Sequence, residues 1–187
     1  MIRCYITDSR ALGGVPQLLA AVPEIIGRGV DWIQVREKHL EARQLLHLVR
    51  RIVEIAHPAG VKVIVNSRTD VGLIAGADGV HLPGKSIGVK SWRQIVPEGW
   101  LIGVSTHSVS EALDAERAGA SYVLLSPIFE SPSKPGYGPA LGLLQLRKAT
   151  EAIHIPVLAL GGVNCSNAGS CVTAGAAGVA GISLFQR

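Results

Sequence analysis

A short unit recurs along this chain: an amphipathic stretch, then a glycine, then a run of aliphatic residues. The four clearest copies have their glycine at Gly29, Gly76, Gly119 and Gly175. A glycine in such a place is typical of the residue that ends a helix in the left-handed conformation, which glycine adopts without the steric cost of a Cβ. Helix, glycine and strand in repeated succession predict the αβ half of a parallel α/β fold.

Four further aliphatic runs bring the predicted strands to eight. These runs are Arg3 to Thr7, Val61 to Val65, Leu101 to Ser105 and Pro156 to Leu160. Helical patterns lie between the strands. Apolar residues recur at helical spacing over 41–57, and Ser108 followed three residues later by Glu111 has the form of a capping box that opens another helix.

Eight strands with intervening helices predict a closed (β/α)₈ TIM-type barrel in one domain, residues 1–187. An open doubly wound sheet is the alternative, which the lack of a G-x-G-x-x-G motif after the first strand disfavours. Apolar residues make up 48% of the chain and aromatics only 4%, which suits aliphatic strands buried on both faces. Because the sequence ends at Arg187, just after the eighth strand, we expect a barrel that lacks its final helix or has that helix encoded outside this sequence.

The charge pattern limits the partners of the protein. The net charge is +4, but lysine and arginine are scattered and no aromatic platform accompanies them, so we expect no nucleic-acid partner. No apolar run is long enough for a membrane span, and the first residues enter a strand without a signal-peptide pattern. We therefore expect a cytoplasmic protein that acts on an acidic small molecule. The oligomeric state stays open, and a homo-oligomer is one of the possibilities.

The three cysteines, Cys4, Cys165 and Cys171, lack metal-ligand spacing and are expected to be buried.

Cationic side chains follow several of the predicted strands. Arg36 and Lys38 end the second strand, and Lys85 and Lys134 lie in the loops after the fourth and sixth. Barrels of this type carry their working residues at these strand ends, whereas Glu37 faces away from Arg36 by strand alternation. A rim rich in cations and poor in carboxylates favours an anionic ligand over a bare metal ion. The alternative for Lys85 and Lys134 is a solvated loop position.

A glycine pair predicts a phosphate site. Gly161 and Gly162 follow the seventh strand, and a helix follows them. Backbone N–H groups can approach an anion closely where no Cβ intervenes, and barrels often bind phosphate between strands seven and eight. Ser183, after the eighth strand, could add a donor. A simple tight turn is the alternative.

His107 is the candidate general acid or base, since it follows the fifth strand and a neutral imidazole can both accept and donate a proton near pH 7. Ser105 ends the same strand. His81 lies in a Gly-Val-His-Leu run and is predicted to be a packed, hydrogen-bonded core histidine. The polar segment 131–137 has the composition of a lid that brings Lys134 onto a bound anion.

Six segments in this order resemble the thiamin phosphate synthase / thiazole tautomerase family. They are Gln34-Val35-Arg36-Glu37-Lys38, Asn66-Ser67-Arg68-Thr69-Asp70, Ala77-Asp78-Gly79-Val80-His81-Leu82, Gly103-Val104-Ser105-Thr106-His107-Ser108, Ser131-Pro132-Ser133-Lys134-Pro135-Gly136 and Gly161-Gly162-Val163. The resemblance runs from Tyr5 to Phe185 and implies a (β/α)₈ barrel. It also implies one of two reactions. A synthase joins a pyrimidine diphosphate to a thiazole phosphate and releases pyrophosphate, using Mg²⁺. A tautomerase aromatises a carboxylated thiazole phosphate by moving a proton, without metal or other cofactor.

The resemblance breaks at two positions. The synthase motif carries aspartates where this chain has Ser67 and, approximately, Ser86. Two neutral hydroxyls cannot supply the charge with which carboxylates hold Mg²⁺, which favours a metal-independent tautomerase with His107 as its catalyst. The synthase is the alternative, because several other residues resemble its substrate contacts. A third option is an inactive relative that binds a thiazole or thiamin phosphate. The residues that resemble synthase contacts are Arg36, Lys38, Asn66, Ser105, Ser131, Ser133 and Lys134.

Overall fold

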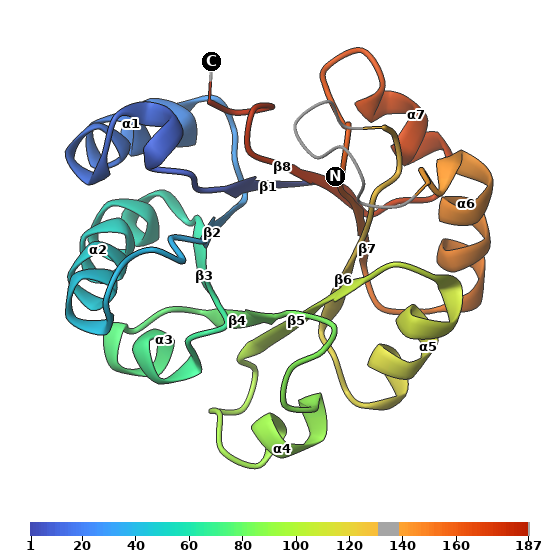
Figure 1. Ribbon diagram of the computed structural model, residues 1–187, viewed down its shortest axis with the longest axis horizontal. Helices are drawn as coiled ribbons and strands as arrows, with labels where there is room; N and C mark the ends of the chain where they lie inside the picture. The colour runs from blue at the N-terminus through green and yellow to red at the C-terminus, as the bar shows by residue number, and fades with distance from the viewer. Residues whose placement is uncertain (131–138, 187) are drawn as a thin grey trace.

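The computed structural model describes residues 1–130 and 139–186. Eight parallel strands close into a barrel in sequence order, with β1 hydrogen-bonded to β8 (Figure 1). This closure confirms the predicted (β/α)₈ barrel and excludes the open doubly wound sheet. The strands are β1 (Ile2–Ile6), β2 (Trp32–Val35), β3 (Lys62–Asn66), β4 (Gly79–Leu82), β5 (Leu101–Thr106), β6 (Tyr122–Leu125), β7 (Val157–Ala159) and β8 (Gly178–Gly181).

Helices surround the barrel on its outside (Figure 1). They bury the outward faces of the strands in two apolar clusters, while a third cluster, which includes Ile64, Leu124 and Leu158, fills the barrel interior. In the described part of the chain the α-helices are α1 (Val15–Gly27), α2 (Ala42–Ala56), α3 (Thr69–Ala75), α4 (Val89–Arg93), α5 (Val109–Arg117), α6 (Gly142–Ala152) and α7 (Ala168–Thr173), with 3₁₀ turns η1 (Arg10–Leu12) and η2 (His57–Ala59).

The four repeated glycines have the predicted backbone conformation. Gly29, Gly76, Gly119 and Gly175 have φ values of +82°, +75°, +93° and +96°. Each lies at or just after the end of a helix, so the repeat in the sequence is a repeat of helix termination.

The Ser108 cap is also confirmed, with one difference. Ser108 Oγ accepts a hydrogen bond from the N–H of Glu111 at 3.1 Å. The Glu111 carboxylate reaches back one residue further than a capping box requires and accepts from the N–H of His107 at 2.7 Å. The start of α5 thereby fixes the backbone that carries the candidate catalytic histidine.

The C-terminal turn covers the barrel flank beside α1 (Figure 1). Phe185 is buried, with its ring 6.2 Å from that of Tyr5 in an edge-on arrangement. The Arg3 guanidinium lies 5.7 Å from the centre of the Phe185 ring, and Arg28 donates to the Phe185 carbonyl. In the residues described, Phe185 thus packs with Tyr5 and the apolar residues of α1 on this flank of β1.

Two of the three cysteines are buried, as predicted, but Cys165 is exposed in the loop before α7. The prediction for Cys165 was wrong because it used the average burial of cysteine and ignored the polar loop around this one. Within the described residues, no helix has both the length and the apolarity that a membrane crossing requires.

Candidate active site

Three side chains form a hydrogen-bonded network inside the barrel, below its C-terminal mouth. His81 Nε2 lies 2.8 Å from Ser105 Oγ, and His81 Nδ1 lies 3.1 Å from the Tyr122 hydroxyl. The strand register explains the arrangement, since His81, Gly103 and Tyr122 are lateral neighbours on β4, β5 and β6. A Cβ on Gly103 would lie 2.0 Å from Tyr122 Cζ, so only glycine lets the Tyr122 ring cross β5 to meet His81.

His81 is a buried neutral histidine. Burial, with a smaller effect from the positive charge of Arg36, lowers the pKa of His81 to about 3. Desolvation penalises the imidazolium because no carboxylate compensates its charge. The structure therefore confirms the prediction of a packed, hydrogen-bonded histidine, and it adds that the partners of this histidine are Tyr122 and the candidate site residue Ser105.

Arg36 places a cation at the mouth. Its side chain is half-buried, and its guanidinium has no hydrogen-bond or ion-pair partner among the residues the structure describes. Glu37, the next residue, is buried and accepts hydrogen bonds from the N–H and the hydroxyl of Ser9, so it faces away from Arg36 as predicted. Lys38 is exposed. A half-buried cation that no carboxylate pairs is suited to bind an anionic ligand.

The turn after β3 is held in an uncommon conformation. Asn66 ends β3 and donates from Nδ2 to Ser67 Oγ at 2.9 Å. Ser67 has φ +64°, and no other non-glycine residue in the described chain has a positive φ. Arg68 forms two hydrogen bonds with Asp70, which lower the pKa of that carboxyl. The Arg68–Asp70 pair is therefore closed on itself, and Asn66 and Ser67 are the polar groups that this turn presents at the strand end.

His107 lies exposed immediately after β5, at the predicted rim. Its Nδ1 is 2.7 Å from the carbonyl oxygen of Ser126. Since a carbonyl can only accept, Nδ1 carries the hydrogen and Nε2 is the nitrogen that can take up a proton in the neutral ring. This tautomer suits the role of general base.

The glycine pair after β7 is a tight backbone contact. Gly161 and Gly162 have φ values of +89° and +65°. A Cβ on Gly161 would lie 2.7 Å from Pro127 Cα, and one on Gly162 would lie 2.5 Å from the Glu130 carbonyl oxygen. Asn167 Nδ2 donates to the Gly162 carbonyl at 3.0 Å and fixes the turn from the other side. Side chains are excluded here, so whatever this turn binds meets backbone.

The remaining predicted site residues divide into two groups. Ser183 is exposed in the turn after β8, and Lys85 and Ser86 are exposed in the loop after β4. The positions of Ser131, Ser133 and Lys134, with the predicted lid, lie outside the described residues. The described strand ends therefore bring together Arg36, Asn66, Ser105, His107, Gly161 and Gly162 at the mouth, with Lys38 and Ser183 at its edge.

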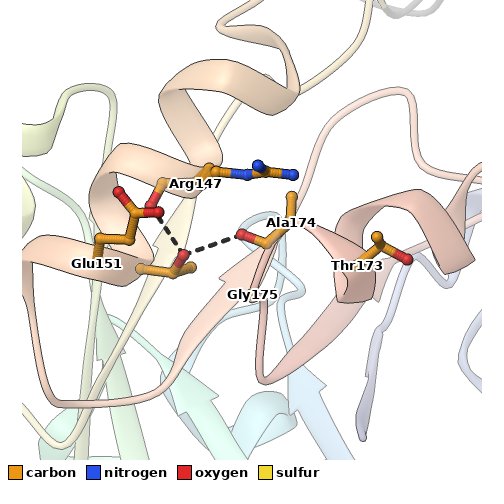
Figure 2. Close-up of a pocket in the computed structure, with 6 residues that line it drawn as sticks. Arg147, Glu151, Thr173, Ala174 and Gly175 are labelled. Carbon is orange, nitrogen blue, oxygen red and sulfur yellow. Dashed lines mark hydrogen bonds between the residues drawn. The ribbon is translucent and has the colours of Figure 1, made fainter.

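Two pockets lie at opposite ends of the barrel. One of about 280 Å³ opens beside β4 and β5 and is lined by residues that include Gly84, Ser86 and Ser105. The other, of about 420 Å³, is lined by Arg147, Thr150, Glu151, Thr173, Ala174 and Gly175 (Figure 2). These residues come from the C-terminal halves of α6 and α7 and the turn into β8, so this larger pocket is far from His107. The smaller pocket is the one that shares a residue, Ser105, with the candidate site.

The residues present do not fit a carboxylate-held Mg²⁺. The resemblance implies aspartates at two positions, and both are serines, Ser67 and Ser86. Among the described histidines, cysteines, aspartates and glutamates, no group of three could hold a metal ion. Mg²⁺ in nucleotide and diphosphate sites is normally held by one or two carboxylates together with substrate phosphates. Serine hydroxyls at these two positions supply none of that charge.

The sequence did not indicate that Tyr122 and Gln34 belong to this buried network. Tyr122 lies behind His81, and Gln34 on β2 is buried nearby with Nε2 lacking a hydrogen-bond partner among the described residues. Interaction with the Gln34 side chain partly offsets the strong rise that burial causes in the pKa of Tyr122. The available signal was strand alternation, which places Gln34, His81, Ser105 and Tyr122 on inward-facing positions.

These features define a class of protein: a (β/α)₈ barrel with the cation of Arg36 and a glycine turn at its mouth. The chain belongs to the thiamine monophosphate synthase family, whose model matches residues 4–185. It is 46% identical over 155 residues to a thiamine-phosphate synthase of Methanoculleus marisnigri, which covers 83% of this chain and 74% of that protein. It is 41% identical over 179 residues to a thiamine-phosphate synthase of Roseiflexus castenholzii, which covers 96% and 78%.

A solved structure agrees with both the fold and the family. The thiamine phosphate pyrophosphorylase from Pyrococcus furiosus matches with a TM-score of 0.87 and 32% sequence identity, over 97% of this chain and 85% of that one. The predicted family resemblance is thereby confirmed. These relatives carry the name of the synthase, so they favour the alternative of the two predicted reactions over the tautomerase.

Proposed function

We propose that this protein is a thiamin phosphate synthase, an enzyme of thiamine biosynthesis that joins a pyrimidine diphosphate to a thiazole phosphate and releases pyrophosphate. The observation that carries the proposal is that two candidate anion sites follow β2 and β7, which lie on different sides of the barrel (Figure 1). Arg36 follows β2, and the Gly161–Gly162 turn follows β7. A reaction between two phosphorylated substrates needs two such places. The similarity to proteins named thiamine-phosphate synthase supports the same assignment.

The β2 side suits the diphosphate. In the reaction the bond between carbon and diphosphate breaks, the electron pair leaves with pyrophosphate, and the thiazole supplies the pair for the new bond. Negative charge therefore grows on the leaving group, where preorganised cations and hydrogen-bond donors lower the barrier. Arg36 and Lys38 supply the charge, and Asn66 on β3 and Ser105 on β5 supply donors.

The β7–β8 side suits the monophosphate. Gly161 and Gly162 form a half-buried turn of positive φ after β7, and Ser183 lies exposed after the neighbouring strand. Backbone N–H groups bind phosphate oxygens without a counter-charge. This part of the site holds the thiazole phosphate while the other half of the mouth handles the leaving group.

Neither of these roles is assigned to a metal. The serines at positions 67 and 86 do not supply the carboxylates that normally hold Mg²⁺. The cationic side chains of the protein itself neutralise the leaving pyrophosphate.

A second candidate function rests on those same two serines. A thiazole tautomerase needs cations for a substrate that carries both a phosphate and a carboxylate, and it needs no metal. His107 would remove a proton from one atom of the thiazole ring and return one to another, which leaves the substrate isomeric and aromatic. The Nδ1–H contact to the Ser126 carbonyl sets the ring for this task, since it assigns the basic lone pair to Nε2.

Both reactions are to be assayed on one preparation, with Mg²⁺ and with EDTA. The synthase proposal predicts that pyrophosphate is released only when both substrates are present. A metal-independent rise in aromatic absorbance from the carboxylated thiazole phosphate, with no pyrophosphate released, would replace it by the tautomerase, and His107→Ala should then abolish the signal. Thermal stabilisation by thiazole phosphate with neither reaction would identify an inactive binding relative.

A further inference from the structure

The buried network below the mouth fixes the direction of its own hydrogen bonds. His81 is 2% exposed and Tyr122 is fully buried, so water does not compete for their polar atoms. A neutral imidazole has one N–H and one lone pair. Whichever ring nitrogen donates to one partner, the other must accept from the second. The role of Ser105 is therefore set by what Tyr122 does on the far side of the ring.

Tyr122 is a donor in this network. Burial raises the pKa of Tyr122 far above its ordinary value, so the phenol keeps its hydrogen. That buried O–H needs an acceptor, and in the part of the chain described His81 Nδ1 is the atom within hydrogen-bond distance, at 3.1 Å. The neighbouring Gln34 side chain lowers the pKa of Tyr122, which is the effect of a donor to the phenol oxygen and not of an acceptor for the phenol hydrogen. A buried hydroxyl left without an acceptor would cost free energy.

We propose that His81 is a positioning residue: held by Tyr122 as the Nε2–H tautomer, it donates to Ser105 Oγ and leaves the Ser105 O–H to donate to an anionic or lone-pair atom of the substrate. The 2.8 Å distance from Nε2 to Ser105 Oγ provides the contact. Ser105 is half-buried near the C-terminal end of β5, so in this proposal its hydroxyl meets His81 from the barrel interior and the substrate from the mouth. In the opposite tautomer, the Ser105 hydroxyl would donate its hydrogen to His81 Nε2, and Ser105 Oγ would present only lone pairs to an anion.

Packing holds the network in place. The Tyr122 ring lies over Gly103 and meets the Trp32 ring edge-on at a centroid distance of 4.9 Å. Because the ring cannot shift, the phenol oxygen stays beside Nδ1. The inference rests on the proposed function only in that Ser105 must touch a substrate; the tautomer itself is a property of the ligand-free protein.

The tautomer is read directly from the ligand-free wild type. Nitrogen-15 NMR of histidine-labelled protein distinguishes a protonated from an unprotonated ring nitrogen, and His81→Gln identifies the signal that belongs to position 81. We expect Nε2 to carry the hydrogen at neutral pH. A protonated Nδ1 overturns the proposal, whatever the protein catalyses.

Kinetics test the consequence at Ser105. Tyr122→Phe removes one oxygen and keeps the ring over Gly103. We expect about a tenfold fall in kcat with KM unchanged, the size expected when one neutral hydrogen bond that orients a catalytic group is lost. In Tyr122→Phe combined with Ser105→Ala, kcat should equal that of Ser105→Ala alone, because the two residues act through one contact. Fully multiplicative losses overturn the proposal.

Two further variants separate positioning from stability. Ile64→Val removes a methyl group from the same buried cluster without touching a polar atom, and it should lower the melting temperature while leaving kcat as in wild type. His81→Gln keeps an amide donor near Ser105 and should retain more activity than His81→Leu. If wild type shows neither reaction, the proposed function fails, and the NMR result still decides the tautomer.

Discussion

The two sides of the barrel mouth are built from different material. On the β2–β5 side, side chains supply the chemistry: Arg36 comes from the end of β2, Asn66 from the end of β3, and Ser105 and His107 from the end of β5. On the β7–β8 side, Gly161 and Gly162 present backbone, and the carbonyl oxygen of Glu130 lies where a side chain of Gly162 would be. The β2–β5 side is therefore altered by substitutions that change charge, whereas the β7–β8 side is altered by the addition of a single carbon atom to a glycine.

In the proposed reaction, this difference would let one mouth bind two anions at separate places. A backbone turn offers dipoles of fixed direction and suits a group that stays in place throughout the reaction. Charged and hydroxyl side chains suit a group whose charge changes, because their strength depends on how they are oriented and paired. In the proposed reaction the mouth therefore divides into a holding half, which is the Gly161–Gly162 turn, and a reacting half, which is the set of side chains at the ends of β2, β3 and β5.

The largest expected effect is a loss of stability from a substitution in the holding half. Gly162→Ala places a Cβ 2.5 Å from the Glu130 carbonyl oxygen at a φ of +65°. We expect the free energy of unfolding to fall by about 3 kcal/mol, from strain and the displaced loop together. Chemical denaturation measures it. Gly169→Ala is the matched control, since a Cβ there meets nothing within 4 Å, and it should be neutral or stabilising. Equal stability of the two variants would remove the claim of a closed backbone contact.

The next largest effect is the pH dependence of stability that His81 causes in the buried network below the mouth. The folded pKa of His81 is about 3, below that of an unfolded histidine, so the unfolded state binds the extra proton as the pH falls. The contribution of His81 to stability is present in full above the unfolded pKa and is lost progressively toward the folded one. Between pH 7 and pH 5 this costs about 2 kcal/mol.

Urea denaturation of wild type and His81→Gln at both pH values isolates this contribution. The variant lacks the titrating ring, so its stability should change less between pH 7 and pH 5 than that of wild type. Identical pH dependence in the two proteins would mean that His81 is charged in the fold or is exposed to water.

The smallest expected effect concerns the Mg²⁺ dependence of the rate and tests the reacting half of the mouth. Ser67→Asp with Ser86→Asp introduces carboxylates where the resemblance implies metal ligands, and Asp tolerates the positive φ of residue 67. We expect Mg²⁺ to raise the rate of pyrophosphate release about tenfold more than it does in wild type. The control, Ser67→Asn with Ser86→Asn, has nearly the same shape without the charge. A similar gain in the asparagine variant would show that shape, not charge, limits the metal response.

The sequence predicts what depends on local periodicity. The helix-ending glycines, the Ser108 cap and the opposite directions of Arg36 and Glu37 all follow from spacings of a few residues. Contacts set by register across three strands are not visible in this way. The meeting of His81 with Tyr122 depends on Gly103 lying between them, and the burial of Phe185 against Tyr5 joins the two ends of the chain. Nothing in the local pattern around Ser67 signals its positive φ.

The division of the mouth is tested most directly by calorimetric titration of wild type and Arg36→Gln with inorganic pyrophosphate and, separately, with thiazole phosphate. Arg51→Gln, which breaks only an exposed ion pair with Glu54 on α2, serves as the control and should bind both anions as wild type does. The account predicts that Arg36→Gln weakens pyrophosphate binding by roughly tenfold or more, as expected for the loss of a charged hydrogen bond, and leaves thiazole phosphate binding almost unchanged. Equal losses for the two anions, or no loss for pyrophosphate, would contradict it.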